Sequence, residues 1–339
     1  MSATGTDGGP LVSSDVFQQI VGEVRKRQKF LLTSHARPDG DSIGSQLAMA
    51  FALDALGKQV RIVNADAPPD HYLEFPGVDR IDITPTVPAD ADADTVIVME
   101  CSDLARTGVA GFDGRYIINI DHHAGNRMYG ALNWFDESAA ACGEMVFDVI
   151  RALGVPMTFE IATHIYLAIL TDTGSFHHSN ITPRTFEICR QTVEAGVKPA
   201  AMARRVFDSN SLGKLKLIGA LLDSMKLVDE GRLAVLYIDD AMLSACGCTH
   251  NDTEGVINLP LTAREVQAVV FFKALSDGEI RVSMRSKYDV DIRRVANHFG
   301  GGGHKNASGF SVTGRLADVQ PDILNRISAA IAEGLQSRP

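Results

Sequence analysis

The chain has 339 residues, of which 45% are hydrophobic and 22% charged, and its formal net charge is −10. This length exceeds the size at which a single hydrophobic core usually stops growing, so two domains are expected. The acidic balance excludes a protein that coats long nucleic acid, because such binding depends on many Lys and Arg contacts to phosphate. No apolar run reaches the ~20 residues that span a bilayer.

The N-terminal part of the chain begins with a tail and continues with alternating strands and helices. Residues 1–14 are rich in Gly, Ser and Thr and lack an apolar signal core, which predicts a disordered tail on a cytoplasmic protein. Short apolar runs then alternate with helical periodicity, as in a parallel sheet whose strands are buried on both faces. Strands are predicted at 30–32, 60–63, 95–99 and 116–120, and helices at 43–56, 138–153, 159–170 and 184–195.

A second pattern begins near residue 229. The segment 199–228 is predicted to be a helical linker, made of one helix or a pair. Beyond it, strands are predicted at 232–238, 266–275 and 279–284, and a last helix at 318–335. The predicted fold is therefore α/β, with a parallel-sheet N-terminal domain at 15–198 and a smaller α/β C-terminal domain at 229–335.

Three groups of metal-ligating side chains follow apolar runs of the N-terminal domain. His35, Asp39 and Asp41 form the densest group, Asp121-His122-His123 the second, and Asp172 stands alone. Carboxylates with an imidazole suit divalent cations such as Mn²⁺. In parallel sheets the reactive groups lie just beyond the carboxyl ends of the strands, so these groups are expected to share one edge. By itself, Asp172 is equally well explained as a cap of the turn that follows it.

Other chemistries leave no signature in the sequence. There is no Gly-x-Ser-x-Gly elbow of a serine hydrolase and no glycine-lysine loop of a nucleoside triphosphatase. Five cysteines, an odd number, indicate reduced thiols, and Cys246-Gly247-Cys248 is interpreted as structural. The glycines at 300–303 form either a plain flexible loop or an anion cradle assisted by His304 and Arg285.

Taken together, these motifs resemble those of the DHH phosphoesterases, and in particular the bacterial nanoRNase/pAp-phosphatase group. The resemblance covers residues 15–330 and implies a DHH catalytic domain followed by a DHH-associated substrate-binding domain. Four signatures in the right order are far more specific than any single one. Three of them lie at 35–45, 121–126 and 171–176, and the fourth, that of the C-terminal domain, consists of 283–286 and 299–309.

The resemblance implies two Mn²⁺ ions, with Mg²⁺ or Co²⁺ as alternatives. One ion takes His35 and Asp39, the other Asp41, His122 and Asp172, and a carboxylate of the second motif bridges them. His123 is implied as the catalytic residue that contacts the scissile phosphate, and Asp121 as a group that orients a ligand imidazole. The implied substrate-binding residues are Asn126, Arg285, Ser286, Gly301, Gly302, Gly303 and His304.

The bridging position departs from the family pattern. Members of the family offer an aspartate after the strand at 95–99, whereas this chain has Glu100, which is one methylene longer. Asp103, three residues further on, is the alternative bridge. We favour Glu100 as the bridge, with Asp103 capping the next helix.

The implied activity is hydrolysis of short oligoribonucleotides to mononucleotides, of pAp to AMP, or of both, by water activated between two metals. Short oligoribonucleotides, pAp and other small nucleotides are the expected partners, while long duplexes and membranes are not, and a homodimer is left open. The alternatives are a cyclic or linear dinucleotide phosphodiesterase, an inorganic pyro- or polyphosphatase, and a nucleotide sensor with impaired catalysis. Because Asp41 lies in a predicted rim loop, its replacement by Ala is expected to leave the fold intact.

Overall fold

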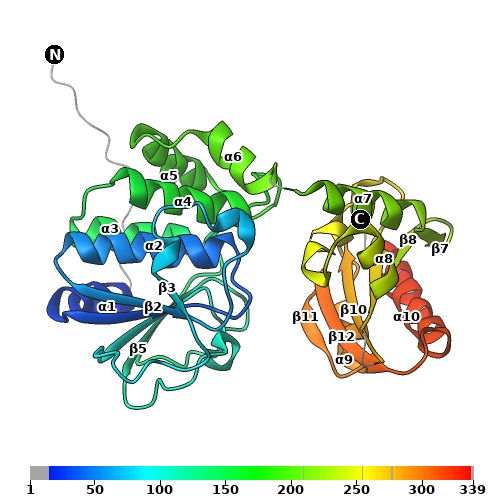
Figure 1. Cartoon of the computed structure of the whole chain (residues 1–339), viewed down its shortest axis with the longest axis horizontal. Coiled ribbons are helices and arrows are strands. Elements are labelled where there is room, and N and C mark those ends of the chain that lie inside the picture. Colours follow the sequence, from blue (N-terminus) through cyan, green and yellow to red (C-terminus); the bar gives the residue numbers. More distant parts are fainter. Residues whose placement is uncertain (1–14, 209, 254, 276–277, 337–339) are drawn as a thin grey trace. The chain divides into compact units, whose positions relative to one another are not determined.

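The computed structural model describes residues 15–208, 210–253, 255–275 and 278–336, so the tail predicted at 1–14 lies outside the described residues. The chain divides into two compact units, 1–209 and 210–339 (Figure 1). This division falls inside the segment 199–228, which contains α6 (Pro199–Phe207) in the first unit and α7 (Leu212–Asp223) in the second. Within the described ranges, no helix combines the length and apolarity needed to cross a membrane.

The N-terminal unit is built on a parallel sheet of six strands in the order β3-β2-β1-β4-β5-β6. The four predicted strands are present, while the two outermost strands were not predicted because they are short. The strand order reverses between β1 and β4, and in such sheets ligands bind beyond the carboxyl ends of the strands at this point. The strands are β1 (Lys29–Thr33), β2 (Gln59–Asn64), β3 (Ile81–Ile83), β4 (Thr95–Met99), β5 (Tyr116–Asp121) and β6 (Leu132–Phe135).

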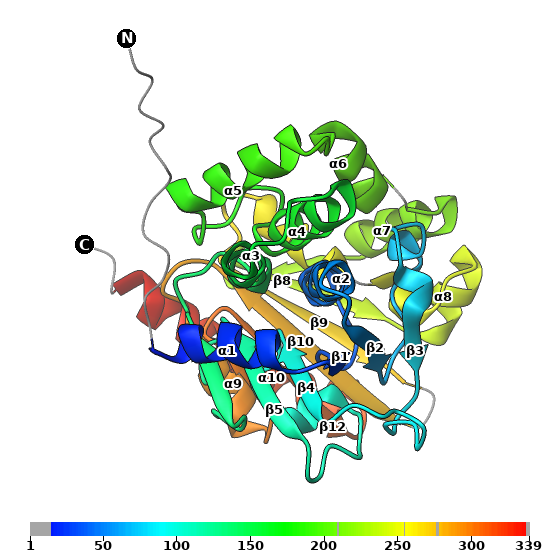
Figure 2. The same ribbon diagram turned by 90° about the vertical axis from the view of Figure 1, so that its left-hand side faces the viewer.

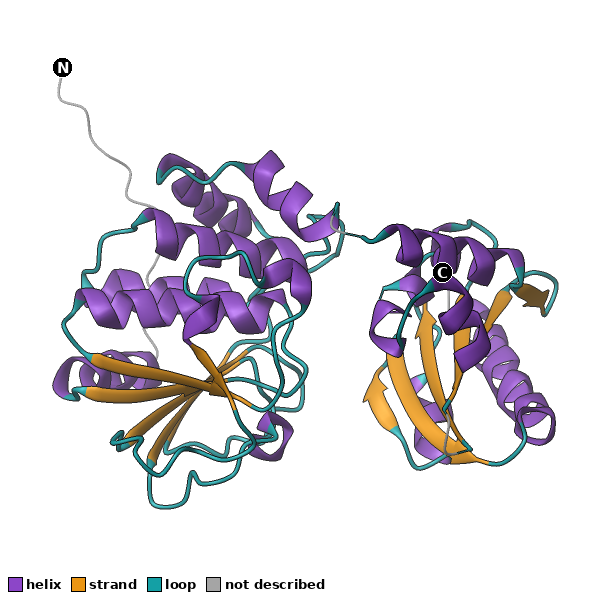
Figure 3. Cartoon of the chain, in the orientation of Figure 1, coloured by secondary structure: helices purple, strands orange, loops and turns teal. Residues whose placement is uncertain are grey.

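Helices cover one face of this sheet, and loops cover the other. Figure 2 shows α2, α3 and α4 side by side over the strands, and one hydrophobic cluster joins them to the sheet. Gly44 allows α2 and α4 to touch, because a Cβ there would lie 2.5 Å from the His164 carbonyl oxygen. Mainly loops cover the opposite face (Figure 3), and loop residues such as Val87, Val109 and Phe112 belong to a hydrophobic cluster with the strands. The helices are α1 (Asp15–Lys26), α2 (Gly40–Ala55), η1 (Asp70–Tyr72), η2 (Val78–Arg80), η3 (Leu104–Thr107), α3 (Cys142–Leu153), α4 (Phe159–Asp172) and α5 (Pro183–Glu194).

The C-terminal unit contains a mixed sheet of six strands in the order β11-β12-β10-β9-β8-β7, in which only β8 and β9 pair in parallel. Its strands are β7 (Lys226–Val228), β8 (Leu233–Ile238), β9 (Ala268–Ala274), β10 (Glu279–Ser286), β11 (Gly302–His304) and β12 (Ala307–Thr313). Its further helices are α8 (Asp240–Cys246), η4 (His250–Thr253), η5 (Val256–Asn258), η6 (Pro260–Thr262), α9 (Arg293–His298) and α10 (Leu316–Gln336).

The two faces of the C-terminal sheet are covered unequally. The cluster with α9 and α10 contacts β8, β9, β10 and β12. On the other face, the buried cluster with α7 and α8 involves β8 and β9, and it includes no described residue of β10, β11 or β12. The outer half of that face therefore carries Arg281, Ser283 and Arg285 outside either core. All five cysteines are free thiols, as predicted.

Candidate metal centre

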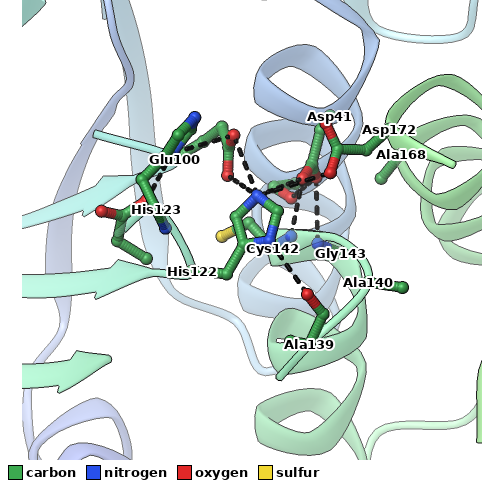
Figure 4. A network of polar contacts seen from close by, with 12 residues as sticks. Asp41, Glu100, His122, His123, Ala139, Ala140, Cys142, Gly143, Ala168 and Asp172 are labelled. Carbon is green, nitrogen blue, oxygen red and sulfur yellow. Dashed lines mark hydrogen bonds and ion pairs between the residues drawn. The ribbon is translucent and has the colours of Figure 1, made fainter. Parts of the chain in front are cut away.

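His122 lies at the centre of a group of four side chains beyond the carboxyl ends of the strands (Figure 4). Its Nδ1 donates to the Ala139 carbonyl oxygen at 3.0 Å, which turns Nε2 toward the carboxylates. Nε2 lies 3.3 Å from both oxygens of Glu100, 3.5 Å from Asp172 Oδ2 and 3.8 Å from Asp41 Oδ2. One ligand atom from each of the four residues lies within 4.8 Å of all the others.

These four residues fit a divalent cation. Ligand atoms that share one cation at about 2.1 Å lie about 3.0–4.2 Å from one another, depending on whether they are cis or trans. The separations of Nε2 from Glu100, Asp172 and Asp41 fall in this range. Among the described residues, the buried Glu100 Oε2 has no hydrogen-bond partner and lies 3.3 Å from His122 Nε2, and a cation would satisfy it. One imidazole and three carboxylates are a donor set for a hard or borderline divalent metal.

Asp41, in the first turn of α2, is buried and serves the fold as well as the site. Its Oδ2 accepts from the Cys142 backbone N–H at 2.6 Å, and its Oδ1 accepts from Gly143 N–H at 3.0 Å and from the Ser45 hydroxyl at 2.8 Å. This carboxylate therefore anchors the N-terminus of α3. Asp41 does not lie in a rim loop, as was predicted, but in a helix, and Asp41→Ala would leave two buried N–H groups without an acceptor, so we now expect this variant to be less stable.

His35 and Asp39 form a separate pair at the end of β1. His35 Nε2 lies 3.6 Å from Asp39 Oδ2, and His35 Nδ1 bonds the Ala36 carbonyl oxygen at 2.9 Å. Asp39 is also the N-cap of α2, where it accepts from Ser42 N–H at 3.0 Å. Within the described part of the chain, neither residue belongs to a group of three or more ligand atoms within 4.8 Å of one another.

Glu100 contacts both histidines of the second motif. It follows β4 directly in the left-handed conformation, with a φ of 56°, and its side chain is 1% exposed. Its Oε1 lies 3.3 Å from both His122 Nε2 and His123 Nδ1. Asp103, the alternative bridge, does not belong to the ligand group around His122. It caps η3 by accepting from Ala105 N–H at 3.1 Å, and it forms an ion pair with Arg127 at 2.9 Å.

The buried carboxylates alter each other's ionisation. Burial, reinforced by the charge of Asp41, raises the pKa of Glu100 well above its usual range and the pKa of Asp172 to about 7. Burial acts to lower the pKa of His122, but the neighbouring carboxylates, Glu100 first, outweigh it and raise that pKa to about 11. Without a cation the group therefore retains protons near neutral pH.

Metal binding is accordingly expected to release protons. A cation requires a neutral His122 and ionised Asp172 and Glu100, so its apparent affinity should fall as the pH is lowered from about 8 to about 6. Calorimetric titration with Mn²⁺ in buffers of different ionisation enthalpy measures the protons released. A binding enthalpy that does not depend on the buffer would contradict this prediction.

Asp121 and Asn126 support His123. Asp121 Oδ1 accepts from His123 Nδ1 at 2.9 Å, so the imidazole that Asp121 orients is that of His123, whereas His122 is oriented by Ala139. Asn126 donates to Asp121 Oδ2 at 2.6 Å and accepts from Met128 N–H at 2.8 Å. Both the Nδ2 and the Oδ1 of Asn126 thus form hydrogen bonds within the protein, although Asn126 was predicted to bind substrate.

In the C-terminal unit, Arg285 and His304 belong to one row across the sheet. Arg285 of β10 lies opposite Ala307 of β12, which lies opposite His304 of β11, and directly opposed residues present their side chains on the same face. Arg285 donates to the Met284 carbonyl oxygen at 3.0 Å and forms no ion pair with a described carboxylate. Burial lowers the pKa of its guanidinium. A half-buried cation without a counter-charge suits an anionic ligand.

The structure also gives the positions of Ser286 and of the glycine run. Ser286 points to the opposite face from Arg285, because side chains alternate along β10, and its hydroxyl donates to the Val290 carbonyl oxygen at 2.7 Å. Ser286 is therefore a structural residue and not a neighbour of Arg285 at a ligand. The glycine run is also not a plain loop, since Gly302 and Gly303 belong to the edge strand β11.

The glycines allow this edge strand to approach β12 closely. A Cβ at Gly301 would lie 2.2 Å from the Gly309 carbonyl oxygen, and one at Gly303 would lie 2.4 Å from that of Ala307. Gly303 also has a φ of 134°, which L side chains rarely adopt. One side of the β11 backbone has no neighbouring strand, as at any sheet edge.

The sequence did not reveal the role of residues 139–143, which orient His122 through the Ala139 carbonyl and Asp41 through two backbone N–H groups. These contacts are made by backbone atoms of small residues, which carry no side-chain signature. The helix was predicted to begin at 138, so the sequence did not indicate that Cys142 and Gly143 lie in its first turn, where N–H groups have no intrahelical partners.

Comparisons with known proteins agree with this architecture. Residues 29–169 match the model of the DHH family N-terminal domain, and residues 231–333 match that of the DHHA1 domain. The bifunctional oligoribonuclease and PAP phosphatase NrnA of Thermus thermophilus is 31% identical over 94% of this chain and 94% of its own. The NrnA protein of Bacillus subtilis is 26% identical over 87% of this chain and 92% of its own.

One solved structure resembles the chain over nearly its whole length. An exopolyphosphatase-related protein from Bacteroides fragilis superimposes with a TM-score of 0.85 at 26% identity, over 94% of this chain and 97% of its own. The chain therefore belongs to the DHH family, as a two-domain DHH–DHHA1 protein of the group that contains the NrnA proteins.

Proposed function

We propose that this protein is a manganese-dependent phosphoesterase that hydrolyses short oligoribonucleotides to mononucleotides and pAp to AMP. The observation that carries the proposal is the convergence of His122 Nε2 with the carboxylates of Glu100, Asp172 and Asp41. The substrates are those in the printed names of the NrnA relatives, which this chain matches over most of its length. The inclusion of an imidazole among the ligands favours Mn²⁺ over Mg²⁺.

In this proposal, His122, Asp41, Asp172 and Glu100 would hold one cation, and His35 and Asp39, with Glu100, would hold the second. Cations held there would supply an activated water molecule and positive charge for the phosphate oxygens. Ala139 holds the His122 imidazole in the orientation that presents Nε2 to the carboxylates. The buried setting, in which Glu100 and Asp41 are each 1% exposed, limits competition from solvent.

His123 is assigned to the scissile phosphate. Its Nδ1 donates to Asp121, which fixes the orientation of the ring, and Nε2 is the atom assigned to the substrate. Asn126 is reassigned from substrate contact to positioning, because it anchors Asp121 through a bond of 2.6 Å. The protein groups therefore bind and orient the phosphate, and no side-chain nucleophile is required.

Arg285, His304 and the glycines 301–303 are assigned to a second phosphate or a nucleotide. Arg285 and His304 lie in one row of the sheet, and the neighbouring row contains Gly309 and Gly302, which leave room for a ligand on the sheet surface. The printed names of the NrnA relatives, which this chain matches over most of its length, favour this function over a pyro- or polyphosphatase. The position of Glu100 inside the ligand group favours an enzyme over an impaired sensor.

Arg285→Ala is expected to raise KM for a diribonucleotide about ten- to a hundredfold, since a hydrogen bond to a charged group contributes about 1.5–3 kcal/mol. A small generic phosphodiester that engages only the metal centre should be affected much less. Steady-state kinetics on both substrates provide the test. Arg281→Ala is the matched control, because Arg281 lies on the same strand and face but in a row beyond the end of β11. Equal losses on the two substrates would contradict a separate binding surface.

A further inference from the structure

Asn180 connects two segments that hold different ligands of the proposed metal centre. Its Nδ2 donates to the Ala140 carbonyl oxygen at 2.8 Å and to the Asp172 carbonyl oxygen at 3.3 Å. Its Oδ1 is buried and has no hydrogen-bond partner in the described structure. One amide group therefore joins the loop before α3 to the end of α4, although 40 residues separate Asn180 from Ala140.

The Ala140 end of this connection belongs to the loop that orients two ligands. Both backbone groups of Ala140 form hydrogen bonds with side chains. Its N–H donates to Glu144 Oε2 at 3.2 Å, and its carbonyl accepts from Asn180. On either side of this peptide, Ala139 O accepts from His122, and Cys142 N–H donates to Asp41. A shift of the Ala140 peptide would therefore move the groups that fix His122 and Asp41.

The Asp172 end of the connection depends on an unusual turn. Three consecutive residues after Asp172 and Thr173 have a left-handed φ: Gly174 at 56°, Ser175 at 59° and Phe176 at 63°. This turn reverses the chain so that Asn180 returns to the carbonyl of Asp172. Phe176 packs on the hydrophobic core and stacks on Phe186, with ring centroids 5.7 Å apart, which holds the turn in place.

We propose that Asn180 is a positioning residue that sets the spacing between Asp172 and the His122–Asp41 side of the metal centre. Two carbonyl oxygens require two N–H donors, which an asparagine amide provides and an aspartate carboxylate does not. Asn180 touches neither substrate nor a ligand side chain, and it acts through the backbone at Ala140 and Asp172. This inference rests on the proposed metal centre.

Asn180→Asp, Asn180→Ala and a matched control, Asn133→Asp, test the proposal. Asn133 lies in the same unit and donates to the Gly130 carbonyl oxygen at 2.7 Å, so its aspartate variant loses the same kind of bond at a backbone carbonyl other than those of Ala140 and Asp172. Calorimetry measures Mn²⁺ affinity, thermal unfolding without metal measures the fold, and kinetics on a diribonucleotide separate kcat from KM.

Asn180→Asp is expected to bind Mn²⁺ about 10–100-fold more weakly, as is typical when a group that orients a ligand is lost. Its kcat should fall at limiting Mn²⁺ and recover at high Mn²⁺, its KM should stay unchanged, and its metal-free Tm should match that of Asn133→Asp. Asn180→Ala should show a smaller loss of affinity, since it adds no charge beside the carbonyls.

Wild-type Mn²⁺ affinity in both Asn180 variants would overturn the inference while leaving the proposed function intact. A fall in the metal-free Tm well beyond that of the control, without recovery of kcat at high Mn²⁺, would also overturn it, because Asn180 would then serve only the fold. If the wild-type protein itself binds no Mn²⁺, the proposed function fails, and this inference fails with it.

Discussion

Asp172→Asn is expected to lower kcat/KM on a diribonucleotide by about 10³-fold, because a cation contributes several kcal/mol to catalysis and each 1.36 kcal/mol is tenfold in rate. The substitution keeps the shape of the side chain and removes its charge 3.5 Å from His122 Nε2. The fold should persist, because Asp172 ends α4 and its side chain is 29% exposed. Kinetics, metal stoichiometry and circular dichroism measure the three effects.

Asp41→Asn makes an informative comparison. It removes a charge from the same ligand group, but Asp41 also accepts from Cys142 and Gly143. We therefore expect it to lower both activity and Tm, whereas Asp172→Asn lowers activity alone. Wild-type rates in Asp172→Asn at limiting Mn²⁺ would contradict the assignment of Asp172 as a ligand.

Glu100→Gln is expected to weaken Mn²⁺ binding and to reduce kcat/KM by about 10²-fold or more, because it removes the charge between the two histidines. Glu100→Asp should instead retain two ions and keep or raise turnover. It restores the ligand length typical of the family, and an aspartate adopts the left-handed conformation found at this position more readily than a glutamate does. Calorimetric stoichiometry and kcat of both variants are the measurements.

Asp103→Asn is the control for Glu100. Asparagine also caps helices, and the ion pair that would be lost joins Asp103 to Arg127, whose side chain is 73% exposed, so the cost should be about 0–1 kcal/mol with near-normal turnover. A severe loss of metal in Asp103→Asn, together with a mild effect in Glu100→Gln, would reverse the assignment of the bridge.

The central strands of the N-terminal sheet were predictable because they are buried on both faces and so appear as continuous apolar runs; β4 (Thr95–Met99) is buried at every position. The edge strands β3 and β6 are short, which leaves little pattern to detect. Helix α1 was missed although its apolar residues Phe17, Ile20, Val21 and Val24 have helical spacing. Helix α3 begins at Cys142, four residues later than predicted at 138, because the preceding residues form the loop that orients the site.

Most of the candidate site was predictable because metal ligands are side chains with distinctive chemistry. Asp41, Glu100, His122 and Asp172 were all expected to meet, and they do. The contacts that could not be predicted are made by backbone atoms or depend on strand register. One example is the Ala139 carbonyl that orients His122. Ser286 was predicted to bind substrate, and only the structure shows that its side chain lies on the opposite face of β10 from Arg285, with its hydroxyl bonded to the Val290 carbonyl oxygen.

The most direct test of the proposed function is turnover by the wild-type protein with and without Mn²⁺ on three substrates: a diribonucleotide, pAp and polyphosphate. The account predicts hydrolysis of the diribonucleotide and of pAp that depends on Mn²⁺ and is abolished by a chelator, with little or no release of phosphate from polyphosphate. Binding of Mn²⁺ without turnover of either nucleotide, or hydrolysis of polyphosphate in preference to both, would contradict it.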